Sequence, residues 1–173
     1  DGLNIGAYAF ELSGIKEFIA PRDLGEIGSL AFYRCRYLNK INFSNVFGSI
    51  QRSAFQETNL HAINIDSIGG DIGQDAFLSN YKLSEVKIGV AAGELQSGAF
   101  EKCKALTNVE FEKGPVKIGS LVFDGSEQLE SFVAGEGLLE IASSAFVLTE
   151  IEPLTLKTIV VDRTHLTTIK LPN

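Results

Sequence analysis

Hydrophobic residues recur along the chain at an interval of 22 or 23 residues. A phenylalanine marks each interval, at Phe10, Phe32, Phe55, Phe77, Phe100, Phe123 and Phe146. An aliphatic residue stands five positions before each phenylalanine, and the residue directly before it is small, alanine in six of the seven cases. A leucine and two further apolar residues follow, as in Leu38, Ile41 and Phe43. A fixed period of this length is the signature of a repeat architecture.

Each repeat reads I-x-x-x-A-F-x-x-[CSTN]-x-x-L-x-x-I-x-I. The last part alternates between apolar and variable positions, which places alternate side chains on one face of a β-strand. A unit of about 23 residues cannot bury its own apolar side, but stacked copies share a continuous core. Parallel pairing at roughly 4.8 Å would give seven coils a length on the order of 33 Å. No stretch predicts a helix of ordinary length, and the A-F-x-x-C segment predicts a single helical or 3-10 turn.

The segments IGSLAFYRCRYLNKINF and LQSGAFEKCKALTNVEF resemble the BspA-like leucine-rich repeats of bacterial and protist surface proteins. The resemblance runs from Ile5 to Pro172. It implies a mostly β leucine-rich-repeat solenoid of about seven stacked coils, with parallel strands and short turns or 3-10 segments. It also implies a secreted or cell-surface location and a non-enzymatic role in adhesion or in binding a protein or glycan partner.

The repeat pattern is irregular at both ends of what we expect to be one domain, residues 1–173. In residues 1–26 the first repeat is one residue short, with Ile15 in the place of leucine. Residues 27–146 are regular. In residues 147–173 the leucine is delayed to Leu156, and a further strand segment with Leu166, Ile169 and Leu171 follows without an A-F segment. Because terminal repeats commonly cap an exposed core, residues 147–173 are interpreted as a C-terminal cap, or else as the place where the array was cut.

The variable positions of the L-x-x-I-x-I segment are expected to point away from the core and to align from coil to coil. One column runs Glu17, Lys40, Ala62, Glu85, Asn108, Ser131, Thr158 and Thr168, and the next runs Ile19, Asn42, Asn64, Lys87, Glu110, Val133, Val160 and Lys170. A broad face of mixed chemistry suits recognition of a protein or glycan better than catalysis. The candidate binding residues are Lys40, Asn42, Asn64, Glu85, Lys87, Asn108 and Glu110. The alternative is a structural spacer whose strand face is merely solvated.

Composition narrows the classes of partner. The formal net charge of −7 argues against a nucleic-acid surface, which needs clustered lysine and arginine to neutralise phosphates. No apolar run approaches the roughly 18 residues of a membrane helix, so we expect no direct membrane insertion by this segment. The chain contains no methionine and opens without a signal sequence, which suggests a piece of a longer protein.

No constellation of residues predicts an enzyme, a cofactor or a metal site. His61 and His165 have no second ligand at metal-binding spacing. Asp66, Asp71 and Asp75 lack the glycine-containing loop that wraps calcium, so a solvated turn is the better interpretation. Motifs for nucleophilic hydrolysis, zinc proteolysis and phosphate binding are absent from the sequence.

The two cysteines occupy one column of the repeat, three positions after the phenylalanine. That column reads Ser13, Cys35, Thr58, Asn80, Cys103, Ser126 and Thr149. Small hydrogen-bonding side chains are expected where a buried turn has backbone groups to satisfy. Because Cys35 and Cys103 are three coils apart, about 14 Å should separate them, and a disulfide needs Cα atoms within roughly 7 Å. The sequence therefore predicts two free, buried thiols.

Overall fold

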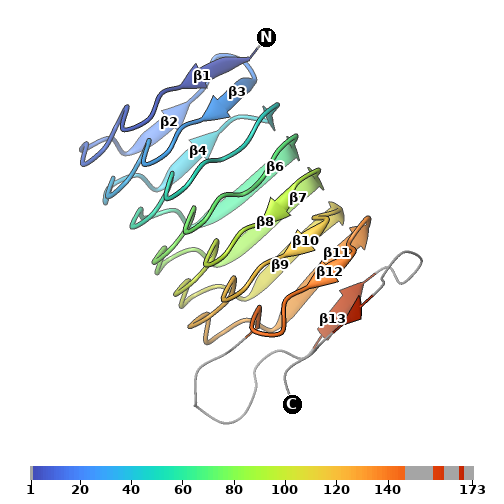
Figure 1. Cartoon of the computed structure of the whole chain (residues 1–173). Coiled ribbons are helices and arrows are strands. Elements are labelled where there is room, and N and C mark those ends of the chain that lie inside the picture. The colour runs from blue at the N-terminus through green and yellow to red at the C-terminus, as the bar shows by residue number, and fades with distance from the viewer. Residues whose placement is uncertain (1, 147–157, 162–167, 170–173) are drawn as a thin grey trace.

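The computed structural model describes residues 2–146, 158–161 and 168–169, which form a solenoid of stacked coils (Figure 1). The described residues contain short strands joined by turns and no helix. The strands are β1 (Leu3–Ile5), β2 (Glu17–Ile19), β3 (Leu24–Ile27), β4 (Lys40–Asn42), β5 (Asn45–Val46), β6 (Ala62–Ile68), β7 (Glu85–Ala91), β8 (Glu94–Leu95), β9 (Asn108–Lys113), β10 (Lys117–Ile118), β11 (Ser131–Glu136), β12 (Glu140–Ile141), β13 (Thr158–Val161) and β14 (Thr168–Ile169).

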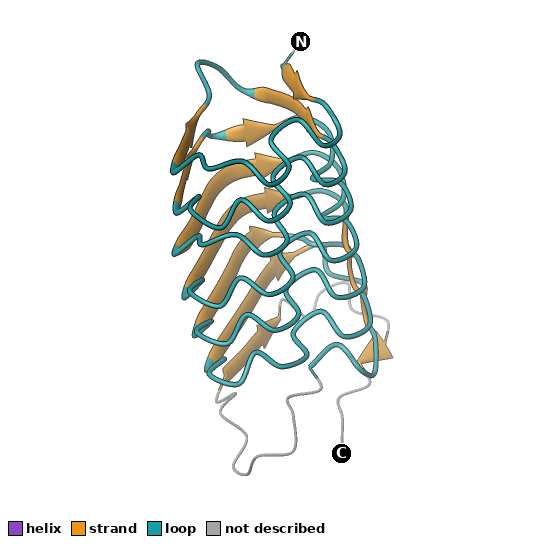
Figure 2. Cartoon of the chain, turned by 90° about the vertical axis from the view of Figure 1, so that its left-hand side faces the viewer, coloured by secondary structure: helices purple, strands orange, loops and turns teal. Residues whose placement is uncertain are grey.

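All strand pairs are parallel, as predicted, and they follow the repeat period. An eight-stranded sheet has the order β1-β3-β5-β6-β7-β9-β11-β13, a four-stranded sheet the order β14-β12-β10-β8, and β2 pairs with β4. In the L-x-x-I-x-I segments, one row of register partners is Ile63, Val86, Val109, Phe132 and Ile159. The leading aliphatic residues form a second row, Ile5, Ile27, Ile50, Ile72, Leu95, Ile118, Ile141 and Ile169. Figure 2 shows the longer strands side by side along one side of the solenoid.

The A-F segments form a third ladder of hydrogen bonds along the solenoid axis. The Phe32 amide donates to the Ala54 carbonyl at 2.7 Å, and the Phe55 amide donates to the Ala76 carbonyl at 2.8 Å. Between these bonds, alternate amides close tight turns within the coil, as Ala54 N does to Gln51 O at 3.2 Å. The backbone thus pairs its own polar groups in the buried interior, which a single exposed turn could not do.

The A-F segment is a short turn, as predicted, but its conformation is not that of a helical or 3-10 turn. The residues two before and two after each phenylalanine, from Phe10 to Phe123, have positive φ. They are Tyr8, Leu12, Leu30, Arg34, Ser53, Glu57, Asp75, Ser79, Gly98, Lys102, Leu121 and Gly125. Alternation between right- and left-handed conformations turns every second N–H toward the next coil. The axial hydrogen bonds therefore stabilise a conformation that most L-residues disfavour.

This conformation predicts an unusual substitution pattern at the exposed Lys102, whose φ is 57°. Lys102→Val is expected to be about 1–2 kcal/mol less stable than Lys102→Asn, because asparagine tolerates the left-handed region and β-branched residues do not. Both variants remove the contact between Lys102 and Glu101, so their difference isolates the backbone effect. Urea denaturation of the two variants measures it. Equal stability would show that Lys102 does not adopt a positive φ.

The core is built on a column of phenylalanine rings. Successive repeat phenylalanines from Phe10 to Phe146 stack with ring centroids 4.9–5.9 Å apart. The small residue before each ring is fully buried from Ala31 to Ala145, and the leading aliphatics are buried from Ile5 to Ile141. In the shortened first repeat, Ile15 and Phe18 pack against this core while remaining partly exposed. Within residues 2–146, the sequence columns assigned to the core therefore pack in it or against it.

The C-terminal strands require one correction. The sequence placed Ile169 in a further L-x-x-I-x-I segment, but Ile169 pairs with Ile141 in the row of leading aliphatics. β13 already supplies the strand-face segment next to β11, with Thr158 opposite Ser131 and Val160 opposite Val133. Thr168, which the sequence placed on the strand face, lies opposite Glu140 of β12 instead. The cap predicted for residues 147–173 lies largely outside the described residues, as do Leu156, Leu166, Leu171 and His165.

Candidate functional site

The strand-face residues predicted to bind a partner are all exposed. The structure brings five of them together on the eight-stranded sheet, where Asn64, Lys87 and Glu110 form one row of register partners. Glu85 and Asn108 form the neighbouring row. The remaining two, Lys40 and Asn42, lie on β4 opposite Glu17 and Ile19 of β2. They belong to the separate two-stranded sheet and are not in a hydrogen-bonded ladder with Asn64.

The rows continue toward the C-terminal coils with less polar residues. Glu85 and Asn108 are followed by Ser131, and Lys87 and Glu110 are followed by Val133. The buried partners Val86, Val109 and Phe132 alternate with them and anchor the face to the core. These strands therefore present a fixed, regularly spaced set of side chains on a rigid support.

Electrostatics on this face are weak and local. Lys87 Nζ lies 3.9 Å from Glu110 Oε1, and both side chains are about half exposed, at 46% and 49%. Exposed ion pairs of this kind contribute little to stability because water and salt screen them. Both charges therefore remain available to an external partner.

The cysteine column has the structural role predicted for it. Cys35 and Cys103 are free and fully buried. Cys35 Sγ donates to the Phe10 carbonyl at 2.8 Å, and Cys103 Sγ donates to the Phe77 carbonyl at 3.3 Å. Ser126 Oγ makes the same bond to the Phe100 carbonyl at 3.1 Å. These side chains satisfy turn carbonyls of the preceding coil and hold adjacent coils in register.

Burial raises the pKa of the Cys103 thiol to about 12, so it stays protonated at neutral pH. Because the thiolate is the nucleophile, we expect Cys103 not to react with a charged disulfide reagent in the native state. In denaturant the same thiol should react at the rate of a free cysteine. Mass spectrometry of the labelled chain over time measures this contrast. Rapid native-state labelling of Cys103 would contradict its buried position in the stack.

Of the aspartates considered for calcium binding, Asp71 and Asp75 bond groups in or near the turns, whereas Asp66 is exposed on strand β6 and not in a turn. Asp71 Oδ1 accepts from the Glu94 amide at 2.9 Å, and its Oδ2 accepts from Gln96 Nε2 at 2.8 Å. Asp75 accepts from Gln74 Nε2 at 3.2 Å, and partial burial, followed by the nearby Glu101, raises its pKa. Within residues 2–146, 158–161 and 168–169, no three acidic, histidine or cysteine side chains gather as metal ligands would. His61 is exposed on the strand side.

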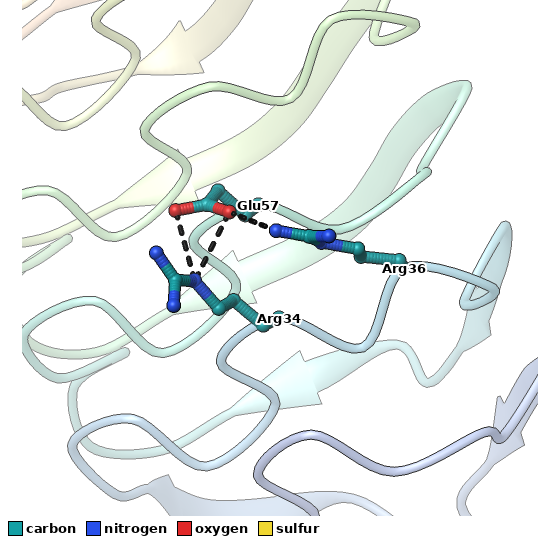
Figure 3. Close-up of polar contacts among 3 residues, drawn as sticks. All are labelled: Arg34, Arg36 and Glu57. Carbon is teal, nitrogen blue, oxygen red and sulfur yellow. Dashed lines mark hydrogen bonds and ion pairs between the residues drawn. The ribbon is translucent and has the colours of Figure 1, made fainter.

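Sequence reasoning missed a second polar cluster, which lies on the A-F turns. Glu57 Oε1 and Oε2 accept from Arg34 Nε at 3.2 and 3.1 Å, and Oε2 also accepts from Arg36 Nη2 at 3.1 Å (Figure 3). The signal was present in the sequence, since Arg34 and Glu57 are 23 residues apart and hold the same position in adjacent repeats. The alternation of aromatic and basic residues in YRCRY was a second indication.

Comparison with known families gives a match over nearly the whole chain. The family described as the BspA type leucine-rich repeat region matches residues 3–114 and 93–173, in six copies. No curated protein matches the sequence. Among the described residues there is no helix long and apolar enough to cross a membrane.

Two solved structures resemble the chain. One is a leucine-rich cell surface protein of Faecalibacterium prausnitzii, at 16% identity and a TM-score of 0.44, with 92% of this chain and 63% of that chain covered. The other is a leucine-rich repeat protein of Bacteroides ovatus, at 14% identity and a TM-score of 0.36, with 99% of this chain and 69% of that chain covered. The chain thus spans less than two thirds of the length of the Faecalibacterium protein.

Proposed function

The chain belongs to the BspA-type leucine-rich repeat family, and from this premise we propose that it is a non-enzymatic binding module of a cell-surface or secreted protein. Its partner is a protein or a glycan, and the exposed strand face is the binding surface. Repeat modules of this family are generally non-enzymatic. Adhesion is the biological setting that such a module would serve.

The observation that carries the proposal is the register of the exposed side chains. Asn64, Lys87 and Glu110 face solvent in one row, and Glu85 and Asn108 do so in the next. Recognition surfaces of solenoids use side chains that neighbouring repeats present at fixed spacing. A mixed set of amide, cationic and anionic groups can bind peptide backbone, carboxylates or sugar hydroxyls.

The second candidate is a structural spacer, and the ion pairs between coils favour it. Lys104 lies 3.4 Å from Glu127 and Lys117 lies 3.4 Å from Glu140, each pair bridging adjacent coils. The Lys87–Glu110 pair has the same form. If the Lys87–Glu110 pair only stabilises the contact between adjacent coils, the strand face has no external partner.

Charge reversal separates the two candidates, since the chain offers a matched control. Arrays of purified extracellular proteins and of defined glycans serve as probes, and each probe bound by the native chain is measured again with the variants. Lys87→Glu and Glu110→Lys are expected to weaken binding at least about tenfold, as loss of a charged contact does. Lys104→Glu removes an equivalent pair away from the strand face and should leave binding unchanged. Binding of no probe by the native chain would favour the spacer, and binding unchanged by Lys87→Glu and Glu110→Lys would show that the strand face is not the site.

A further inference from the structure

A cavity of about 340 Å³ lies on the turns of the first two coils, away from the strand face. It is lined by Leu12, Ser13, Gly14, Arg34, Arg36 and Tyr37. Its size falls at the lower end of the range of small-ligand sites, which is roughly 300–1,000 Å³. Two of its six lining residues are arginines, although the whole chain carries a formal charge of −7.

The repeats of residues 27–146, expected to be regular, are not all of one length, and the cavity lies where neighbouring coils differ by one residue. Five residues lead from Phe10 to Ile15, six from Phe32 to Leu38, and five again from Phe55 to Leu60. After this one-residue difference in length, the first two coils pair again: the Asn39 amide donates to the Lys16 carbonyl at 2.9 Å. The segment from Phe32 to Leu38 is therefore one residue longer than the equivalent segments of the coils on either side, and its extra residue must project from the stack.

Tyr37 stands in that projection and is 64% exposed. On the adjacent first coil, Gly14 adds no side chain, and a Cβ built there would meet nothing within 4 Å. The cavity is thus the open space beside a projecting aromatic ring.

The two arginines are held in place by groups outside the cavity. Glu57 bonds both guanidinium groups (Figure 3). The Arg34 guanidinium carbon also lies 5.0 Å from the centroid of the Tyr33 ring. Glu57 uses only Nε of Arg34 and one Nη of Arg36. Among the described residues, no protein group accepts a hydrogen bond from the two terminal nitrogens of Arg34, so their planar donor edge is open to a ligand. Two positive charges and one negative charge leave the cluster cationic.

We propose that this cavity binds an acidic sugar residue, with its carboxylate on Arg34 and Arg36 and its ring against Tyr37. Guanidinium groups match the planar geometry of a carboxylate and bind it with paired, charge-assisted hydrogen bonds. The exposed tyrosine ring and Leu12 supply an apolar surface for the C–H face of a sugar. An aspartate or glutamate side chain of a peptide would fill only a small part of the cavity. Preordered arginines lower the entropy cost of binding.

The test uses the whole chain and four soluble probes, observed by amide chemical shifts in two-dimensional NMR. The probes are 3′-sialyllactose, a glucuronic acid disaccharide, neutral lactose and a short glutamate-containing peptide. One or both acidic sugars should shift the amides of Ser13, Gly14, Arg34, Arg36 and Tyr37 at millimolar concentration, and added salt should weaken this binding. The two acidic sugars distinguish a sialic acid from a uronic acid. Equal binding of lactose, tighter binding of the peptide, or no shift at these amides would overturn the proposal.

Four variants test the cavity itself. Arg36→Gln and Tyr37→Ala should weaken acidic sugar binding about ten- to a hundred-fold, as loss of a charged or stacking contact does. Gly14→Leu should abolish binding by filling the cavity while leaving the thermal unfolding of the chain unchanged, because the site is open. Glu57→Gln should tighten binding several-fold, since it removes the negative charge and keeps an oxygen acceptor for the arginines.

Whether Glu57→Gln strengthens or weakens binding of the acidic sugar distinguishes a binding site from an ion cluster that only joins the coils. If the arginines serve only to join coils, Glu57→Gln would not strengthen sugar binding, and the proposal fails. Lys104→Gln, which removes a lysine from the Lys104–Glu127 pair three coils further on, is the control and should have no effect. A loss of binding with this control equal to that with Arg36→Gln would also overturn the proposal. None of these results bears on the strand face, so the proposed function stands or falls separately.

Discussion

Replacing Phe77 by alanine is expected to lower the free energy of unfolding by about 3–5 kcal/mol, the cost of deleting a large buried aromatic side chain. Phe77 is fully buried, and its ring stacks between those of Phe55 and Phe100, with centroid distances of 5.3 and 5.1 Å and nearly parallel planes. Neighbouring rings cannot move into the space, because axial hydrogen bonds of the backbone fix each coil at its own level. The variant therefore retains most of the cavity that the substitution creates.

The position of Phe77 in the middle of the column adds a second expected effect. A stack of repeats is stabilised by contacts between neighbours, so weakening one central coil uncouples the two halves. Unfolding in urea should change from one transition to two, or show a smaller dependence on denaturant. Tyr81→Ala is the control in the same coil, because that side chain is 54% exposed and should cost little. Similar losses for the two variants would mean that the phenylalanine column does not carry the stability of the stack.

The architecture could be predicted from the sequence because residues at the same position of successive repeats become register partners in the sheet. Ile63, Val86 and Val109 occupy the same place in successive units, so counting along the sequence places them opposite one another, and the structure pairs them. The same counting placed Cys35 and Cys103 in different coils and correctly gave them a hydrogen-bonding role. A periodic sequence is unusually informative since every prediction is made several times.

The backbone conformation of the A-F turns was not predictable from residue type. Glycine at positions 98 and 125 is consistent with positive φ, but Leu30 and Arg34 adopt it with no local preference for it. Hydrogen bonds from neighbouring coils impose the conformation, and such bonds form only after the coils have stacked. Tertiary context therefore overrides local preference here.

The candidate strand face was predicted as one continuous surface, yet Lys40 and Asn42 pair only with β2. The one-residue difference in coil length falls directly before these strands, and regular pairing with the next coil resumes at Asn45 and Ser67. The strand-face columns of the sequence give no sign of this change in length, because the residues at these positions are polar whichever strand they pair with. The same change in length lies beside the cavity at Tyr37, so both proposed sites depend on how the repeat departs from or keeps its period.

Asn80→Asp is expected to destabilise the chain by about 3–5 kcal/mol at neutral pH, as an uncompensated buried charge does. Asn80 is fully buried, and its Nδ2 donates to the Phe55 and Phe77 carbonyls at 2.8 and 2.9 Å. Its Oδ1 accepts from the Thr58 hydroxyl. A carboxylate would turn an acceptor toward both carbonyls, which is repulsive and leaves them without their donor.

The pH dependence of this variant gives a sharper test than its stability at one pH. Burial and the two carbonyls should raise the pKa of the new carboxyl in the folded state above its unfolded value of about 3.9. The folded chain then binds more protons than the unfolded chain over that interval, so stability falls as the pH rises and recovers on acidification. Asn80→Ser is the control, since Ser126 shows that a hydroxyl serves this column, and it should cost about 1 kcal/mol with no such dependence. If the aspartate and serine variants had parallel stability profiles between pH 4 and 7 in denaturant titrations, the side chain at position 80 would not face these carbonyls. The proposed role of the column in holding coils in register would then be wrong.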